Sequence, residues 1–205
     1  MARAQELEPI VPGISIWQVY EPAVKAELFS TALTTDSGTY LVDPIPLAAD
    51  SLAALRARGE TIGIFVTNAN HDRAAAKFAR DFSVPTYAHY TLGGKIEFAD
   101  VIGVKDGQTL AGGLTVIAVD GGAVGEMALH CFQDGGTMVM GDALINFEPH
   151  GFGLLPSKYC LDPKLMRRSL RKLLDYPFAR IFFAHGIPIL SGARGKVEQL
   201  LASDQ

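Results

Sequence analysis

A buried strand, a helix and a second buried strand follow one another in the middle of this chain, and this order restricts the fold more than any other feature. Residues 62–67 form a short apolar run bounded by polar residues, which is typical of a strand buried on both faces. A helical stretch over 73–82 and a second apolar run over 84–88 come next. Strands that are joined through a helix lie parallel in one sheet, with the helix on its face. The sequence therefore predicts an α/β fold.

Segments with strand patterns lie on both sides of this unit. Before it, we expect strands over 14–20, 27–35 and 39–42, a hairpin turn over 36–38 and a helix over 47–58. After it, Gly-rich turns separate strands over 114–119, 127–132 and 137–140, and the stretch 146–159 is predicted to form a loop near the cleft. A helix that starts at Asp162 and Pro163, a strand over 181–184 and a helix over 193–202 complete the chain.

Two packed sheets with helices on the outside satisfy this order, so we predict a four-layer αββα sandwich. The sequence contains no fixed-period repeat, low-complexity tract or Ser/Gly-rich linker. A length of 205 residues also leaves little room for two complete domains. Residues 1–205 are therefore predicted to form a single domain.

The charge balance and the apolar pattern bear on partners and location. The chain has 18 basic and 22 acidic residues, a net charge of −4, so it lacks the basic field that favours nucleic acid or anionic lipid. The first residues lack the apolar core of a signal peptide, and no apolar run approaches membrane-spanning length. Cys131 and Cys160 are interpreted as reduced thiols. We expect a cytoplasmic protein that binds a small molecule, with anionic molecules among the candidates, and neither nucleic acid nor membrane.

Three polar segments end predicted strands: Thr-Asn-Ala-Asn-His-Asp-Arg at 67–73, Met-Gly-Asp at 140–142 and Ala-His-Gly at 184–186. Their order and placement resemble the metallo-β-lactamase fold superfamily, in which the first segment normally reads T-H-x-H-x-D-H. The resemblance covers the chain from about Ile14 to Leu190. It implies an αββα sandwich of metallo-β-lactamase type and a metal-dependent hydrolase.

The departures from the family motif fall on the metal ligands. The three histidines of the first metal would be replaced by Asn68, Asn70 and Gly122, and an amide is a poor substitute for imidazole on zinc. Of the second metal's ligands, the resemblance leaves Asp72, Asp142 and His185, with Arg73 in place of a histidine. It therefore implies no metal or a single divalent ion (Mn, Fe, Mg or Zn) and argues against dinuclear zinc. His89, His130 and His150 match no ligand position.

Several of these residues admit two interpretations. Arg73 is either a solvated arginine at a helix start or the partner of Asp72 and Asp142 in a salt bridge within the former metal pocket. Asp72 is either a ligand or a helix N-cap. His71 is either structural or a member of a replacement motif, T-N-x-x-H-x-R, with Asn68 and Arg73. Glu126 follows the Gly-rich turn and is a candidate partner of Arg73.

Three functions remain open. The first is a hydrolase of an ester, amide or phosphoester in which Asp142 or His71 acts as general base and Arg73 stabilises developing negative charge, while Asn68, Asn70 and Glu126 contact the substrate. The second is a non-catalytic relative that binds a small anionic ligand in the cleft through Arg73. The third is a nucleic-acid module built on the basic stretch 158–172, although a solvated helix face explains that stretch more simply.

Overall fold

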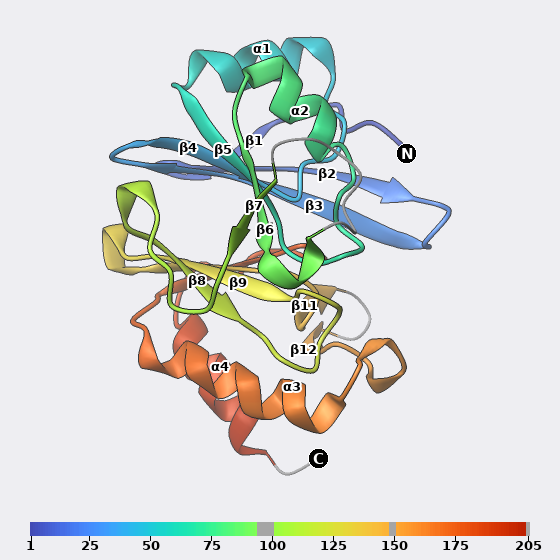
Figure 1. The fold of residues 1–205 in the computed structure, drawn as a ribbon, viewed down its shortest axis with the longest axis vertical. Coiled ribbons are helices and arrows are strands. Elements are labelled where there is room, and N and C mark those ends of the chain that lie inside the picture. The colour runs from blue at the N-terminus through green and yellow to red at the C-terminus, as the bar shows by residue number, and fades with distance from the viewer. Residues whose placement is uncertain (94–100, 148–150, 204–205) are drawn as a thin grey trace.

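The computed structural model describes residues 1–93, 101–147 and 151–203. Within these ranges the strands form a seven-stranded sheet, a four-stranded sheet and a two-stranded hairpin (Figure 1). The larger sheet keeps its strands in chain order: β1 (Glu8–Val11), β2 (Ile14–Glu21), β3 (Ala26–Thr35), β4 (Gly38–Val42), β5 (Thr61–Val66), β6 (Thr86–His89) and β7 (Val101–Val104). Strands β1 to β4 pair antiparallel, and β4 to β7 pair parallel.

The parallel half of the larger sheet contains the predicted strand–helix–strand unit. Helix α1 (Ala49–Ala57) connects β4 to β5, and α2 (Ala75–Phe82) connects β5 to β6. Strand β5 is buried along most of its length, as its uniformly apolar sequence predicts. The two-residue turn between Thr35 and Gly38 also forms as predicted, because these residues face one another in the β3–β4 register.

The smaller sheet has the order β13-β10-β9-β8, and β10 and β13 run parallel. Its strands are β8 (Leu114–Ala118), β9 (Met127–Cys131), β10 (Thr137–Met140) and β13 (Arg180–Phe183). Helix α3 (Pro163–Ser169), its 3₁₀ extension η5 (Leu170–Asp175) and α4 (Ala193–Ala202) cover its outer face. Asp162 caps α3 as predicted, because its Oδ1 accepts a hydrogen bond of 2.9 Å from the backbone nitrogen of Leu165.

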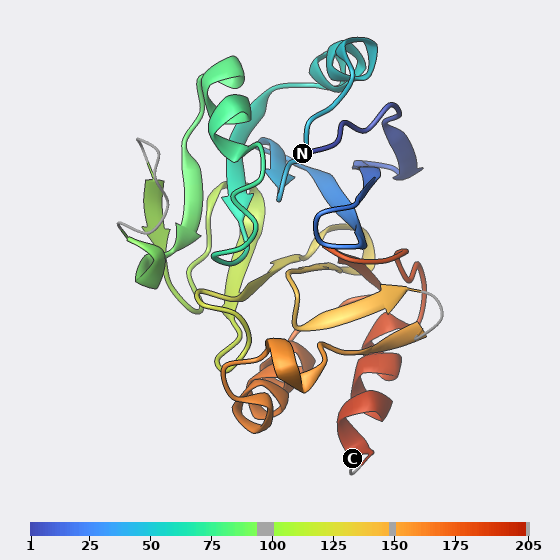
Figure 2. The ribbon, with the colours of Figure 1, turned by 90° about the vertical axis from the view of Figure 1, so that its right-hand side faces the viewer.

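Three hydrophobic layers hold the sandwich together. One lies between the larger sheet and helices α1 and α2, and includes Trp17, Leu41 and Phe78. A second lies between the two sheets, and a third lies between the smaller sheet and helices α3 and α4. Figure 1 shows this order from top to bottom, and Figure 2 shows it from the side. The predicted four-layer αββα sandwich is confirmed.

The structure differs from the sequence prediction at several elements. The stretch 146–159, predicted as a loop, contains part of a hairpin formed by β11 (Leu144–Phe147) and β12 (Gly151–Leu154). Strands β1 and β7 were not predicted. Helix α2 begins at Ala75 rather than Arg73, because Arg73 has a left-handed backbone with φ of 39°. His150 lies outside the described residues. None of the helices in the described ranges combines the length and apolar character that crossing a membrane requires.

Candidate functional site

Polar side chains from four strand ends meet between the two sheets. Asp43 follows β4 and His71 comes five residues after β5, whereas Asp142 and His185 each come two residues after β10 and β13. Within each sheet these strands are parallel neighbours, so their carboxyl ends lie at the same edge. This is the edge at which open α/β sheets bind ligands.

His71, Asp142 and His185 form the centre of the site. The Nε2 atom of His71 lies 3.1 Å from Oδ1 of Asp142, and the Nε2 atom of His185 lies 3.2 Å from the same oxygen. The ligand atoms of the three residues all lie within 4.8 Å of one another. Yet Oδ1 is buried and makes no hydrogen bond, so neither ring nitrogen is aligned to donate to it. The two ring nitrogens therefore lie close to Oδ1 without forming a hydrogen bond to it.

Neighbouring acceptors fix which nitrogen of each imidazole carries the proton. Nδ1 of His71 lies 2.8 Å from Oδ2 of Asp43, and Nδ1 of His185 lies 2.9 Å from the carbonyl oxygen of Glu27. A carboxylate and a carbonyl can only accept, so both Nδ1 atoms donate. The Nε2 atom of each neutral imidazole is then an acceptor that faces Asp142. Three acceptor atoms therefore converge, which is a stable arrangement when a cation or an added proton lies among them.

Asp43 anchors this cluster, although the sequence did not point to it. Its Oδ1 accepts from the backbone nitrogen of Thr67 at 2.8 Å, and its Oδ2 accepts from the Thr67 hydroxyl at 2.5 Å as well as from His71. Asp43 is buried and has a left-handed backbone, with φ of 48°. Non-glycine residues held in this region often belong to functional sites. The signal in the sequence was its place at the end of a predicted strand, like Asp142.

The charges of the cluster perturb one another strongly. Burial disfavours the charged form of Asp142, but the imidazoles of His71 and His185 hold its pKa well below the usual range. Burial and the charge of Arg73 oppose protonation of His71, whereas the charges of Asp142 and Asp43 favour it. The effect of the two carboxylates is larger, so the pKa of His71 is raised to about 9. Burial, with the charge of Asp142, raises the pKa of Glu126 to about 8. The site therefore stabilises added positive charge at the point between Asp142 and the imidazoles.

Asn68 and Glu126, predicted to contact substrate, are fully buried beside Asp142. The amide nitrogen of Asn68 lies 2.9 Å from Oε2 of Glu126 and 3.1 Å from Oδ2 of Asp142. Glu126 also accepts a hydrogen bond of 3.0 Å from the backbone nitrogen of Ala143. Among the described residues, no hydrogen bond or ion pair joins Glu126 to Arg73.

Arg73 makes neither of the ion pairs that the sequence suggested. One guanidinium nitrogen, Nη1, donates to the carbonyl oxygens of Phe29 at 2.6 Å and Asp43 at 3.1 Å. The other, Nη2, approaches the carbonyl oxygen of Ala184 at 3.5 Å. Because Phe29 belongs to the larger sheet and Ala184 follows β13, Arg73 joins the two sheets beside the cluster.

The remaining predicted residues lie outside the centre of the site. Asp72, a predicted ligand, is exposed, and its Oδ1 accepts a hydrogen bond of 2.7 Å from the backbone nitrogen of Arg73. It is neither the N-cap of α2 nor a member of the group that could hold a metal; His71 takes that place. The left-handed turn at Arg73 follows directly. Asn70 is also exposed, and its backbone nitrogen donates to Oδ1 of Asn68 at 2.9 Å.

Comparison with known proteins agrees with this architecture. The family described as "Metallo-beta-lactamase superfamily" matches residues 9–202, nearly the whole chain. The chain belongs to the metallo-beta-lactamase superfamily. The comparison with curated proteins gives no match.

Solved metallo-beta-lactamase structures share the fold. The DIM-1 metallo-beta-lactamase is 18% identical with a TM-score of 0.74, over 96% of each chain. A metallo-beta-lactamase from Pontibacter korlensis is 15% identical with a TM-score of 0.73, over 97% of this chain and 99% of that one. TTHA1623, solved in a di-iron-bound form, is 22% identical with a TM-score of 0.64, over 88% of this chain and 97% of that one. At these identities the likeness shows the fold alone.

The side chains that could ligate metal in this chain fit one metal ion and do not fit two. Asn68, Asn70 and Gly122 supply no imidazole for a first metal. His71, Asp142 and His185 do supply a set, because their acceptor atoms converge around a buried oxygen that has no hydrogen bond. The two separations from Oδ1 of Asp142 to the imidazoles, 3.1 and 3.2 Å, are close to the roughly 3.3 Å expected between ligands of a tetrahedral zinc ion, and all three ligand atoms lie within 4.8 Å of one another. Two imidazoles and a carboxylate suit Zn, Fe or Mn better than Mg.

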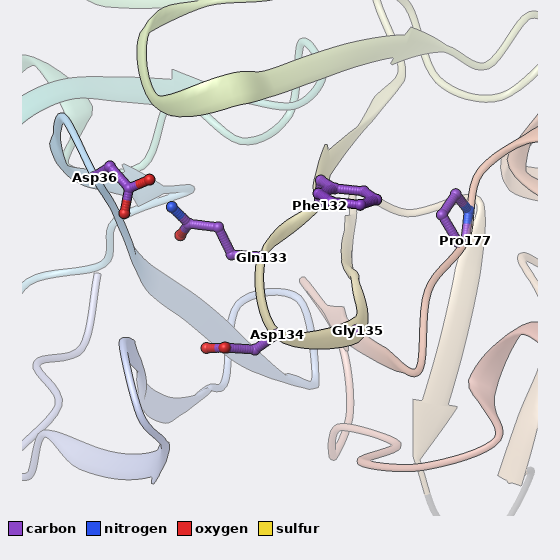
Figure 3. A pocket seen from close by; sticks show the side chains of 6 residues that line it. All are labelled: Asp36, Phe132, Gln133, Asp134, Gly135 and Pro177. Carbon is purple, nitrogen blue, oxygen red and sulfur yellow. The ribbon is translucent and has the colours of Figure 1, made fainter.

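A separate hollow of about 500 Å³ lies at the opposite end of the sheets (Figure 3). It is lined by Asp36, Phe132, Gln133, Asp134, Gly135 and Pro177. These residues precede strands β4, β10 and β13, whereas Asp43, Asp142 and His185 follow the same strands. The hollow is therefore distinct from the candidate metal centre.

Proposed function

We propose that this protein is a hydrolase of the metallo-beta-lactamase superfamily that holds one divalent metal ion on His71, Asp142 and His185. Its substrate would be a small ester, amide or phosphoester. The observation that carries the proposal is the convergence of the Nε2 atoms of His71 and His185 on a buried carboxylate oxygen that lacks a hydrogen bond. Three protein ligands with a remaining open position are typical of catalytic rather than structural metal sites.

The chain's own residues supply orientation and electrostatics. When bound, the metal would supply a Lewis acid and lower the pKa of a coordinated water. Asp43 fixes the tautomer and ring direction of His71, and the carbonyl of Glu27 does the same for His185. The guanidinium of Arg73 is directed at backbone carbonyls, so in this proposal it acts as a structural cation and not as a donor to substrate.

The alternative, a non-catalytic relative that binds an anionic ligand through Arg73, has less support. That role needs guanidinium donors that face the cleft, whereas those of Arg73 are used by Phe29 and Asp43, with Ala184 close by. A small-molecule substrate and a cytoplasmic location remain part of the proposal. Arg167, Arg171 and Lys172 of the basic stretch bind groups within the molecule, which leaves fewer cations for a nucleic-acid partner.

Metal content and turnover test the proposal together. Protein purified without chelators should contain close to one equivalent of a transition metal by mass spectrometry, and it should hydrolyse at least one compound in a panel of esters, thioesters, lactams and phosphodiesters. Asp142→Ala and His185→Ala should lose both metal and turnover. His89→Ala is the matched control, since His89 binds Thr91 away from the cluster and should keep both. A metal-free protein that hydrolyses none of these compounds would contradict the proposal.

A further inference from the structure

The amide of Asn68 bridges two buried carboxylates. Its nitrogen has two hydrogens and lies within hydrogen-bonding distance of Oε2 of Glu126 and Oδ2 of Asp142, at 2.9 and 3.1 Å. Its oxygen accepts from the backbone nitrogen of Asn70, which fixes the direction of the amide. Asn68 is fully buried and Glu126 is 2% exposed, so neither side chain is open to a substrate that arrives from solvent.

The surrounding backbone is shaped to hold Glu126 in place. A Cβ atom on Gly141 would lie 2.5 Å from Oε1 of Glu126, and one on Gly122 would lie 2.8 Å from its Cγ. Oε1 accepts from the backbone nitrogen of Ala143, which is the residue after Asp142. Glu126 therefore fills the space beside Gly122, a position that the superfamily resemblance assigns to a metal-binding histidine.

The bridge bears directly on Asp142. Of the two carboxylate oxygens, Oδ2 is held by Asn68, whereas Oδ1 is left facing Nε2 of His71 and of His185. The two oxygens of a carboxylate are equivalent, so a half-turn about the Cβ–Cγ bond restores the same arrangement, whereas a partial turn breaks the contact with Asn68. The Asn68 contact thus holds the plane of the carboxylate in the orientation in which its other oxygen lies beside Nε2 of His71 and of His185.

We propose that Asn68 and Glu126 are positioning residues that fix Asp142 as a metal ligand, in the space where the superfamily resemblance would place the first metal. This inference rests on the proposed ligand role of Asp142. Residues that hydrogen-bond to a metal ligand without touching the metal typically change metal affinity about 10–100-fold when they are removed. Asn68 and Glu126 should therefore affect metal binding, although neither touches the metal.

The first test measures Co²⁺ affinity and the visible spectrum of the Co²⁺ protein. Glu126→Gln preserves shape, but whichever way the new amide faces, its nitrogen meets a donor, either the Asn68 amide or the Ala143 backbone nitrogen. Glu126→Gln and Asn68→Ala should each weaken Co²⁺ binding about 10–100-fold and shift the absorption bands. The matched controls, Glu198→Gln and Asn70→Ala, alter exposed side chains and should leave Co²⁺ affinity within twofold of the parent. Parent-like affinity and spectra in Glu126→Gln would overturn the proposal.

A second measurement needs no metal. The ¹⁵N shifts of His71 and His185 should change in metal-free Glu126→Gln, because a reoriented Asp142 alters the surroundings of both Nε2 atoms. Unchanged shifts would overturn the positioning role. If the parent binds no Co²⁺, the proposed hydrolase fails on that result, whereas these imidazole shifts still decide whether Asn68 and Glu126 orient Asp142.

Discussion

Asp43 shows how one strained residue can organise the site. Its left-handed backbone, with φ of 48°, costs about 1–3 kcal/mol for a non-glycine residue. The strain is offset by hydrogen bonds from Thr67 and His71 to its carboxylate and from Ser30 and Arg73 to its carbonyl oxygen. Asp43 thus connects His71, a proposed metal ligand, to the guanidinium of Arg73.

Asp43→Asn should weaken metal binding about 10–100-fold. An amide nitrogen in place of Oδ2 would face two donors, the Thr67 hydroxyl and Nδ1 of His71, and would favour the tautomer of His71 that carries its proton on Nε2. Titration with Zn²⁺ against a competing chelator measures the change. Asp72→Asn is the discriminating comparison: it should leave metal affinity unchanged, and a larger loss there than in Asp43→Asn would restore Asp72 as the ligand.

His130 offers a test of pH dependence away from the metal centre. Burial holds the pKa of His130 below its usual 6.5, even though Nε2 donates to the carbonyl oxygen of Pro177 at 2.8 Å. The unfolded chain then binds this proton more readily than the folded chain. The stability linked to His130 is complete above pH 6.5 and is lost as the pH falls toward its lower folded value. Urea unfolding between pH 7.5 and 5 should show a shallower decline for His130→Gln than for the parent, and equal slopes would contradict this account.

At the level of elements, the basic stretch has a structural role that its charge pattern did not reveal. Nη2 of Arg167 donates to the carbonyl oxygens of Leu200 and Leu201 at 2.9 and 3.2 Å, and also to that of Ser203. Arg171 donates to Leu201 at 2.9 Å. These carbonyls end α4, where a helix has unpaired acceptors and attracts positive charge. The two arginines therefore join α3 and its extension to the end of α4.

Arg167→Ala should lower the free energy of unfolding by about 1–2 kcal/mol, because it removes a charged donor from several helix-end carbonyls. Lys164→Ala removes an exposed cation from the same helix and should stay within about 0.5 kcal/mol of the parent. Urea titrations of both variants measure the difference. Equal stabilities of the Arg167→Ala and Lys164→Ala variants would show that the basic stretch is only a solvated helix face.

The elements that could be predicted are those specified by local pattern. The apolar run of β5, the cap at Asp162 and the helix over 193–202 all follow from residues close in sequence. Strand β11 pairs locally with β12 but also has a distant neighbour, because the backbone nitrogen of Asn146 donates to the carbonyl oxygen of His185, and local pattern does not reveal that second contact. In the site, Asp142 and His185 could be placed at strand ends. The sequence suggested Asp72 as their companion, whereas the structure places His71 beside them. This difference could not be predicted, because it depends on the left-handed turn at Arg73, a conformation that arginine rarely adopts.

Across the whole molecule, the site lies where the two sheets are joined. The backbone nitrogen of Phe29 in β3 donates to the carbonyl oxygen of Ala184 at 2.9 Å, and Arg73 contacts both of these residues. Arg73→Met should lower the free energy of unfolding by about 2–4 kcal/mol, since it removes a charged donor from backbone carbonyls at the junction of the two sheets. Arg73→Lys should recover less than half of this loss, because an ammonium lacks the planar fork. Full recovery by lysine in urea titrations would show that charge alone matters.

Metal binding should stabilise the entire domain, because its ligands come from both sheets. His71 follows β5 in the larger sheet, whereas Asp142 and His185 follow β10 and β13 in the smaller one, so an ion bound to all three exists only when the sheets are packed together. At a free metal concentration 100 times Kd, mass action adds about 2.7 kcal/mol to stability. For a domain of this size, this corresponds to a rise in Tm of roughly 5–11 °C. Differential scanning calorimetry of chelator-treated protein, with and without Zn²⁺ or Mn²⁺, measures the rise. Asp142→Ala should show almost none of it, and a rise as large as in the parent would mean that the metal binds elsewhere.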